Sequence, residues 1–383
     1  MLRPKTKEYF DIFSTGGDRY QVRGSEYVSV LSGNAIRDVF SRLLPLLDGK
    51  HTTQELIEKL DDLSQVETMN ALIKKLGDLG ILEDASDREY QELSPAQQEA
   101  YQNQMLFFGI ASRDSQEPNK ARFQKALSES KLSIIGAGEL ASKTAAECAR
   151  VGIGTVVGVN LAGEALIPSA GDRGIIETPG WALEDVEAIK HLVAQAPPDL
   201  LVLALDRPEP AFLKLINSIS IDCNVPLLHS QVNGAKGVVG PLVVPGKTAC
   251  LMCHHLRVIR NYDFYDEYVE WEKWIEAEGK QTRSPAATIS PFTSIIAGLT
   301  ALEIVKRLSG FYEPELYGKF LTVNGLTLEV APHKVLRIPR CPSCGKLRDK
   351  ANFTPWVKDE RHNSKERISF RPPVDAGKNG GGR

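Results

Sequence analysis

The stretch Lys131-Leu-Ser-Ile-Ile-Gly-Ala-Gly-Glu-Leu-Ala141 decides the fold of most of this chain. Residues 132–135 form a short apolar run typical of a buried strand. Gly136-Ala-Gly138-Glu-Leu-Ala141 follows with the G-x-G-x-x-A spacing of a tight turn that opens a helix. Backbone N–H groups at such a helix start can bind phosphate. We therefore predict a βα unit here, with Gly136 and Gly138 as candidate nucleotide-binding residues.

The same pattern continues along the chain as apolar runs alternating with amphipathic segments. Apolar runs at 155–159, 200–205 and 225–228 alternate with helical spacing at 140–151, 181–194 and 211–219. Late strands are expected at 237–244 and 320–330, on either side of a helix at 291–308. This alternation predicts a parallel, doubly wound α/β sheet.

Two polar residues stand at the ends of the second and third predicted strands. Asn160 occupies the place where a nucleotide-binding protein of this type carries an Asp or Glu that holds the ribose. Asp206 follows the run 200–205, at the edge of the sheet where ligands bind, so it is either a ligand for the Mg²⁺ of ATP or a solvated loop residue. The glycine turn is correspondingly either a working phosphate cradle or a structural remnant.

Residues 1–85 are predicted to form a small domain of their own. Three β-rich stretches at 9–14, 19–23 and 27–32 are separated by turn residues, which predicts a three-stranded meander. Helical spacing follows at 36–47, after the Thr52-Thr53 cap, and again around residues 69–76. This order of elements is typical of a winged-helix-like module. Residues 86–130 are expected to be a linker with two helices, residues 131–354 the large domain, and residues 355–383 a disordered tail.

Composition and charge exclude several classes of protein. The 383 residues are 42% hydrophobic and 25% charged, with a net charge of −3, which is typical of a globular protein. Residues 1–90 carry 12 Lys and Arg against 16 Asp and Glu, a net of −4, so the winged-helix-like part lacks the basic surface that nucleic acid requires. No long apolar run or apolar leader is present, which predicts a cytoplasmic protein without a membrane partner.

Four of the six cysteines form two C-x-x-C pairs, Cys250/Cys253 and Cys341/Cys344. In a reducing compartment such pairs are metal ligands before they are disulfides, and zinc takes four thiolates in a tetrahedron. We predict a structural Zn²⁺ held by all four. His254 and His255 adjoin the first pair, but a closed site leaves them no coordination position. Cys148 and Cys223 are expected to pack in the core.

Residues 95–350 resemble the ThiF-like family, the adenylating proteins related to ubiquitin-activating enzymes. The resemblance is carried by AYQNQMLFFG at 100–109, IIGAGELAS at 134–142, LALD at 203–206, VPLLHS at 225–230, the two cysteine pairs and SPFTSIIAGLTALEIVKRLSG at 290–310. It implies a Rossmann-type fold and, in active members, adenylation of a carboxyl terminus with MgATP. This chain departs from the active pattern at Asn160, Glu139 and Asn103, and LAGEALIPSAGDRG stands at 161–174 in place of the family's Asn/Arg run.

A narrower resemblance covers residues 1–350. LLPLLDGKHTTQELIEKL at 43–60 and VVGPLVVPGKTACLMCHHLR at 238–257 are similar to ThiF-like leader-peptide-binding proteins of thiazole/oxazole-modified peptide pathways. The resemblance implies a non-catalytic scaffold that binds the leader of a precursor peptide and serves a YcaO-type cyclodehydratase. It also implies a homodimer as one arrangement. In that family the leader adds a strand to the front sheet beside the third helix, which here points to Tyr27, Val28, Val30, Leu31, Met69, Leu72, Ile73 and Leu76.

The competing function is an ATP-dependent adenylating enzyme that acts on a peptide or carrier-protein carboxylate. The two functions differ in their need for ATP, because only the enzyme has to bind the nucleotide well. The residues of the predicted peptide groove have a second interpretation as well, since helical spacing places such residues in the core of a small domain.

Overall fold

A computed structural model describes residues 2–16, 19–24, 27–34, 36–60, 65–86, 93–111, 120–160, 175–178, 186–278 and 286–347. The chain divides into two units, Met1–Lys346 and Leu347–Arg383. The tail predicted at 355–383 lies outside the described residues, and so do the run 161–174 and the start of the helix predicted at 181–194. The finer domain boundaries expected at residues 85, 130 and 354 stay predictions.

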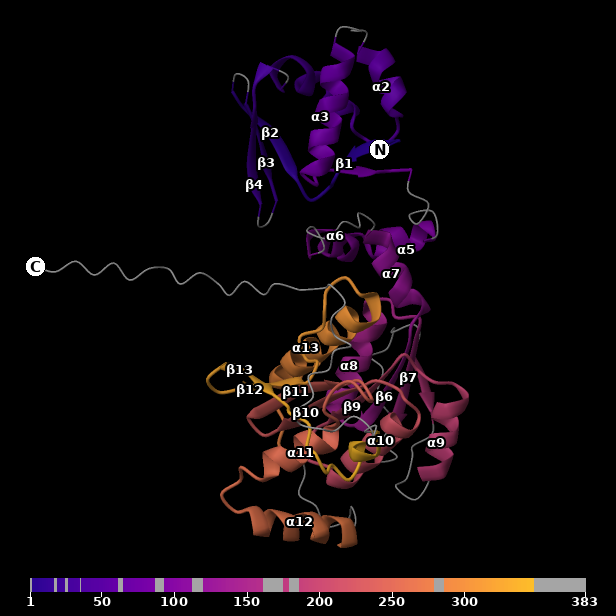
Figure 1. Ribbon diagram of the computed structural model, residues 1–383, viewed down its shortest axis with the longest axis vertical. Coiled ribbons are helices and arrows are strands. Elements are labelled where there is room, and N and C mark those ends of the chain that lie inside the picture. The colour runs from indigo at the N-terminus through magenta and orange to yellow at the C-terminus, as the bar shows by residue number, and fades with distance from the viewer. Residues whose placement is uncertain are drawn as a thin grey trace, which may run out of the picture. The chain divides into compact units, whose positions relative to one another are not determined.

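The described residues of the front part of the chain, between 2 and 86, form two small sheets, a helical stretch made of the consecutive η1, α1 and η2, and the helices α2 and α3 (Figure 1). Its elements are β1 (Pro4–Thr6), β2 (Asp11–Gly16), β3 (Arg19–Arg23), β4 (Val28–Ser32), η1 (Ile36–Phe40), α1 (Ser41–Leu43), η2 (Leu44–Leu46), α2 (Thr53–Leu60), α3 (Val66–Asp78) and β5 (Leu82–Asp84). The predicted meander is confirmed, since β2, β3 and β4 form an antiparallel sheet in that order. The winged-helix-like assignment stays a prediction.

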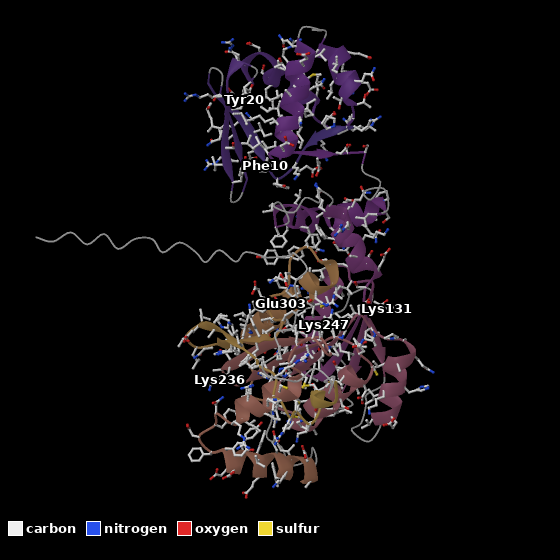
Figure 2. The ribbon with its side chains drawn as sticks, in the orientation of Figure 1. Phe10, Tyr20, Lys131, Lys236, Lys247 and Glu303 are labelled. Carbon is white, nitrogen blue, oxygen red and sulfur yellow. The ribbon has the colours of Figure 1, made fainter. Side chains whose placement is uncertain are left out.

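Apolar residues from the meander and all three helical segments share one core. Phe10 and Tyr20 lie inside this part of the chain, and the Tyr20 ring meets the fully buried Phe40 edge-on at 5.1 Å (Figure 2). Val22 and Leu31 reach the same core from β3 and β4. Sequence reasoning missed the pairing of β1 with β5, which joins the first strand of the chain to the strand after α3. Strands of three residues are too short to show a period of two.

Among the described residues, the front part is followed by the helices α5 (Pro95–Ala100), α6 (Gln102–Ala111) and α7 (Lys120–Glu129). Ser94 caps α5 in a capping box with Gln97, so helix begins inside the stretch expected to be linker. At the start of α7, the ammonium of Lys120 lies 3.3 Å from the carboxylate of Glu83 on β5, and both side chains are almost completely buried. A buried ion pair therefore joins the front part to α7.

An eight-stranded sheet forms the centre of the remaining chain, in the order β13-β12-β11-β10-β9-β6-β7-β8. Its elements are β6 (Lys131–Ala137), α8 (Glu139–Arg150), β7 (Thr155–Asn160), β8 (Ile175–Thr178), α9 (Val186–Gln195), β9 (Leu200–Leu205), α10 (Pro210–Asp222), β10 (Leu227–Asn233), β11 (Lys236–Val243), α11 (Leu251–Ile259), α12 (Tyr265–Glu278), α13 (Ser290–Ser309), β12 (Lys319–Asn324), β13 (Val330–Lys334) and η6 (Cys344–Leu347). Strands β10, β9, β6, β7 and β8 are parallel, as predicted, and β11 to β13 are antiparallel.

Helices cover both faces of this sheet, with α8 and α13 on one side and α10 and α11 on the other (Figure 1). The fully buried strand β9 shows why. Leu200, Val202 and Ala204 pack toward α8 and α13, and the alternate residues of the strand pack toward α9, α10 and α11. A strand buried on both faces is a continuous apolar run, and this is the pattern the sequence displays. None of the described helices is long and apolar enough to cross a membrane.

The single late strand expected at 320–330 is wrong, because the chain turns back within it. Strand β12 ends at Asn324, whose side-chain oxygen accepts hydrogen bonds from the N–H groups of Leu326 and Thr327. Leu328 has a φ of 58°, a left-handed conformation that a strand does not allow. The chain then re-enters the sheet as β13, which pairs with β12. The apolar side chains of this turn, Leu326 and Leu328, gave a strand-like pattern although both are exposed.

Asp84, at the end of β5, fixes the chain start to the front part. Its carboxylate accepts hydrogen bonds from the N–H groups of Leu2, Arg3 and Ser86 and from the Ser86 hydroxyl, at 2.6–3.0 Å. Partial burial disfavours the charged carboxylate, but these bonds outweigh it and lower the pKa of Asp84 to about 2. A depressed pKa stabilises the fold above the unfolded pKa of about 4, and the stabilisation is lost as the pH falls toward 2.

We therefore expect Asp84→Asn to lower the free energy of unfolding by about 1 kcal/mol at pH 7, after allowing for solvent screening. The difference from wild type should shrink between about pH 4 and pH 2. Urea unfolding at several pH values measures both quantities. Asp11→Asn is the control, because the exposed Asp11 side chain forms no hydrogen bond within the described residues. A pH-independent difference would contradict the role given to the charged carboxylate.

Candidate functional site

The four cysteines of the two C-x-x-C pairs come together in the folded chain. Cys250 precedes α11 and Cys253 lies in its first turn, whereas Cys341 and Cys344 lie in the last described segment and at the start of η6. All four are buried, and their sulfur atoms lie within 4.8 Å of one another. The Cys250–Cys253, Cys250–Cys341 and Cys253–Cys344 sulfur distances are 3.7, 3.6 and 3.6 Å.

This geometry fits a tetrahedral metal ion. Four thiolates that each lie about 2.3 Å from one zinc ion are about 3.8 Å apart, close to the distances found here. The N–H group of Ile338 lies 3.3 Å from the Cys253 sulfur and points to it as a donor. Hydrogen bonds from Cys250 and Ile338 lower the pKa of Cys253 to about 5 despite its burial. The buried four-cysteine cluster can therefore hold a metal such as zinc, and the metal would join the last described segment to α11.

The glycine turn has the predicted conformation, but its glycines serve the packing of the turn itself. Strand β6 ends at Ala137, Gly138 has a φ of 94°, and α8 begins at Glu139. A side chain at Gly136 would collide with the carbonyl oxygen of Ala204 on β9. A side chain at Gly138 would collide with the carboxylate of Asp206. Both glycines are thus required by neighbouring groups of the same chain.

The Asp206 carboxylate occupies the place where a helix of this type binds phosphate. Its two oxygens accept hydrogen bonds from the N–H groups of Glu139, at 2.6 Å, and Leu140, at 2.9 Å. These are the first two residues of α8, whose free N–H groups and positive dipole end favour an anion. Burial raises the pKa of Asp206, the two backbone bonds oppose this, and the nearby Glu139 adds to it.

Glu139 adds a second negative charge to the same corner of the fold. A hydrogen bond from Ser290, and then the ammonium of Lys143 at 3.1 Å, lower the pKa of Glu139. Lys143 also donates to the Ser290 hydroxyl at 2.8 Å and to the Ser290 carbonyl at 3.0 Å, at the start of α13. Two carboxylates therefore stand where a triphosphate would need positive charge. Asn160 ends β7 in register with Gly136, and its side chain lies outside the described residues.

The eight residues predicted for the peptide groove differ in burial. Leu31 on β4 and Met69, Leu72, Ile73 and Leu76 on α3 are buried in the core of the front part. Tyr27 packs partly against that core, whereas the side chains of Val28 and Val30 are 53% and 57% exposed. The structure thus places five of the eight inside the core and leaves the two valines of β4 accessible to a partner.

Strand β4 is an open edge of the meander. Within the described residues it pairs only with β3, in a regular register from Val28↔Arg23 to Ser32↔Arg19. The N–H group of Gly24 donates to the Tyr27 carbonyl at 2.8 Å, so Gly24 and Tyr27 form a hydrogen-bonded pair of the ladder. Hydrogen-bonded and non-hydrogen-bonded pairs alternate along an antiparallel ladder, so Val28 and Val30 belong to non-hydrogen-bonded pairs. It follows that the N–H and C=O groups of Val28 and Val30 point away from β3. The other edge strand, β2, has a bulge between Ser14 and Gly16, which protects an edge from pairing.

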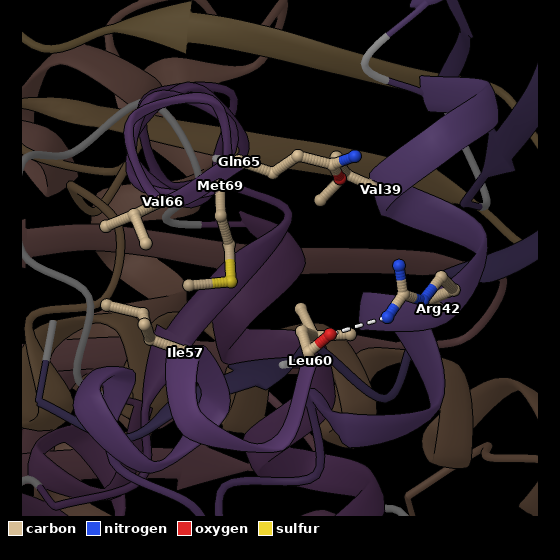
Figure 3. A pocket seen from close by; sticks show the side chains of 7 residues that line it. All are labelled: Val39, Arg42, Ile57, Leu60, Gln65, Val66 and Met69. Atoms are coloured by element: carbon tan, nitrogen blue, oxygen red, sulfur yellow. Dashed lines mark hydrogen bonds between the residues drawn. The ribbon is translucent and has the colours of Figure 1, made fainter. Parts of the chain in front are cut away.

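A cavity beside α3 is too small to hold a peptide side chain. It lies between α1, α2 and α3, where Arg42 donates to the Leu60 carbonyl at 2.6 Å (Figure 3). Its volume is about 10 Å³, room for about one water molecule. The residues that line it are Val39, Arg42, Ile57, Leu60, Gln65, Val66 and Met69.

A much larger cleft lies between the antiparallel half of the large sheet and helices α11 and α12. We call it the histidine cleft and define it by His229, His254, Tyr262, Tyr268, Trp271 and Glu329 among its lining residues; its volume is about 1180 Å³. Burial lowers the pKa of His229 to about 4 and that of His254 to about 3, so both rings are neutral at pH 7. The sequence does not reveal this cleft, because its pattern does not predict α12 and the two histidines after Cys253 are candidates only for metal binding.

Comparison with known proteins shows what part of this chain is similar to a known family. Residues 178–345 match the model of the ThiF family. Protein HesA of Leptolyngbya boryana is 26% identical over 286 residues, which cover 69% of this chain and 90% of HesA. The resemblance recognised in the sequence is therefore confirmed for the ThiF-like part.

Two kinds of solved structure share the fold over 90% of this chain. The heterocyclase TruD superimposes with a TM-score of 0.62 at 19% identity, and this chain spans 43% of the length of TruD. E. coli MccB, solved with ATP, superimposes with a TM-score of 0.61 at 16% identity and is covered over its full length. At these identities the likeness concerns the fold, and it includes the front part of the chain.

Loss of a cluster thiol should remove the metal and destabilise the large sheet. We expect Cys344→Ser to lower the melting temperature by roughly 10 °C, because a metal bound only in the folded state contributes directly to stability. Elemental analysis and thermal unfolding of the purified chain measure the two effects. Cys223→Ser is the control, since Cys223 lies outside the cluster. Equal metal content in wild type and Cys344→Ser would contradict a four-thiolate site.

If Asp206 caps α8, MgATP should leave the melting temperature of the wild-type chain unchanged at concentrations up to about 1 mM. Asp206→Ala should lower the free energy of unfolding by about 1 kcal/mol, as the loss of other helix caps does. Thermal unfolding with and without MgATP tests both statements. A nucleotide-dependent rise in wild type that Asp206→Ala abolishes would instead make Asp206 a ligand of the bound MgATP.

Proposed function

We propose that this chain, which carries a ThiF family domain, is a scaffold that binds the leader of a ribosomally made precursor peptide and presents it to a YcaO-type cyclodehydratase. The heterocycle-forming step would then belong to the partner. The front part would take up the leader, and the ThiF-like part would hold it in position, with a structural zinc ion in the four-cysteine cluster. The likeness in fold to the heterocyclase TruD supports this assignment of roles to the two parts of the chain.

The observation that carries the proposal is the open edge of β4. Unpaired N–H and C=O groups on a regular edge strand can bind an extended peptide as an additional strand, so main-chain bonds supply affinity for many sequences. Val28 and Val30 combine outward backbone groups with exposed apolar side chains on one face of the sheet. An added strand would cover those side chains, and its own alternate side chains would select the sequence.

The competing function is adenylation of a peptide or carrier-protein carboxylate. Its support is the match to the ThiF family and the likeness in fold to MccB, which has been solved with ATP. Against it stand the Asp206 carboxylate at the start of α8 and the Glu139 carboxylate beside it. Binding of a triphosphate would require Asp206 to leave both N–H groups and Lys143 to change partners. We therefore place the scaffold first.

A proline at position 30 tests strand addition. Val30→Pro removes an outward N–H group without removing a bond of the β3–β4 ladder, and edge strands tolerate proline. We expect the affinity for a synthetic leader segment of the precursor peptide encoded beside this chain's gene to fall about tenfold, measured by isothermal titration. Val30→Ala is the matched control, because it keeps the N–H group while it shortens the side chain.

Several outcomes separate the functions. A larger loss for Val30→Ala than for Val30→Pro would mean that the side chain, and not the strand edge, binds the peptide. Mixing the chain with MgATP, the precursor and a neighbouring YcaO-type protein should produce loss of water from the precursor in mass spectrometry, and the same mixture without that partner should not. Peptide-dependent pyrophosphate exchange by the chain alone would favour adenylation.

A further inference from the structure

The two stretches of chain that carry the four-cysteine cluster are strongly basic. Residues 245–262 contain three Lys and Arg, residues 330–348 contain five, and neither stretch has an Asp or Glu. The cluster brings the two stretches together, because the Cys250–Cys341 and Cys253–Cys344 sulfur distances are both 3.6 Å. A chain with a net charge of −3 therefore concentrates positive charge at this place.

Two guanidinium groups are held across the junction of the two stretches. The Nε of Arg257 on α11 donates to the Leu336 carbonyl at 2.7 Å, and the Nε of Arg337 donates to the Thr248 carbonyl at 2.8 Å. Within the described residues, Nη1 of Arg257 and both η nitrogens of Arg337 form no hydrogen bond. A guanidinium fixed at one edge keeps its other nitrogens in a defined direction, and such groups bind carboxylates well.

Two further cations and one apolar side chain lie next to these guanidinium groups in the chain. Lys247 precedes Thr248, Arg340 precedes Cys341, and both cations are exposed. Leu336 is 63% exposed. We call this region the basic surface and define it by Lys247, Arg257, Leu336, Arg337 and Arg340. Its four cations form no ion pair within the described part of the chain, so their charge is available to a partner.

Balancing the charge of a metal-bound cluster does not account for these cations. Zinc and four thiolates together carry about two negative charges, fewer than the four positive charges of the basic surface. None of the four side chains donates to a cluster sulfur among the described residues, whereas the Ile338 N–H group does. Lys247, Arg257 and Arg340 are exposed, but the four cysteines are buried. The excess positive charge therefore faces solvent.

The composition of the basic surface favours a protein partner over a nucleic acid or a membrane. Residues 245–261 and 334–348 contain no Phe, Tyr or Trp on which a base could stack. A single exposed leucine is too little apolar area to anchor the chain in a lipid surface. A protein segment that carries carboxylates and an apolar side chain complements both the cations and Leu336.

We propose that the basic surface binds an acidic segment of a partner protein. Carboxylates of that segment would meet the free nitrogens of Arg257 and Arg337 and the side chains of Lys247 and Arg340, and an apolar side chain would cover Leu336. Because the cysteine cluster joins the two stretches, it also holds these cations in one place. This site is separate from the β4 edge and does not rest on the proposed leader binding.

The test uses the full chain and a fluorescein-labelled peptide of alternating Glu and Leu, with fluorescence anisotropy as the measurement. A peptide of alternating Lys and Leu of the same length is the charge control. The salt concentration is about 0.1 M, where exposed charges more than about 10 Å apart are largely screened. Lys247→Glu and Arg340→Glu should each weaken binding of the Glu-Leu peptide about tenfold. Lys273→Glu reverses the charge of an exposed lysine on α12, outside the basic surface, and should change the affinity by less than about twofold.

Each outcome supports or overturns the site. Glu-Leu binding that Lys247→Glu and Arg340→Glu weaken and Lys273→Glu spares supports it. Equal binding of the Lys-Leu peptide, equal effects of all three substitutions, or no binding of the Glu-Leu peptide overturns it. Displacement of the labelled peptide by an equal concentration of oligothymidylate overturns the assignment to a protein partner. Val30→Pro should leave this binding unchanged, so a failure here is distinct from a failure of leader capture at β4. Melting temperature and metal content verify that each variant is folded.

Discussion

The carboxylate of Asp206 at the start of α8 is the contact on which the chemistry of the large sheet depends. A helix that opens after a parallel strand presents free N–H groups and the positive end of its dipole, and something negative has to meet them. In this chain the anion is Asp206, which follows β9 and accepts hydrogen bonds from the first two N–H groups of α8. Gly138 is required because no side chain fits beside this carboxylate. A fold suited to phosphate is thus stabilised by its own carboxylate.

The four-cysteine cluster also brings distant parts of the chain together. Its two halves are separated by most of the antiparallel strands, the cleft and α13, so a metal at this point would close a long loop of chain. The cluster also sets the start of α11, where the Leu251 N–H group donates to the Asn217 side chain at 2.9 Å. His254 and His255 follow directly, and their direction into the cleft is fixed by the same turn of helix.

Two accessible surfaces of the described residues differ in chemistry. The β4 edge offers backbone groups with little charge, whereas the histidine cleft offers aromatic rings and carboxylates. These two surfaces also lie on two different sheets. The buried Lys120–Glu83 pair joins the front part to α7, the helix that leads into β6, and removing either charge from this pair would be costly because both side chains are buried.

The sequence by itself determined the parallel sheet, the meander and the four-cysteine cluster, because each is encoded by local spacing: continuous apolar runs, turn residues between β-rich stretches, and paired cysteines. It did not determine what the glycine turn binds, since Gly136 and Gly138 have the same spacing whether phosphate or Asp206 lies beside them. Nor did it separate core from surface on β4 and α3, where Met69, Leu72, Ile73 and Leu76 proved to be core and Val28 and Val30 accessible. Only the tertiary structure decided these points. Asp206 lies about 60 or more residues from the glycine turn that it contacts, and β4 and α3 are separate elements of the chain. No local pattern in the sequence records which of these groups will meet.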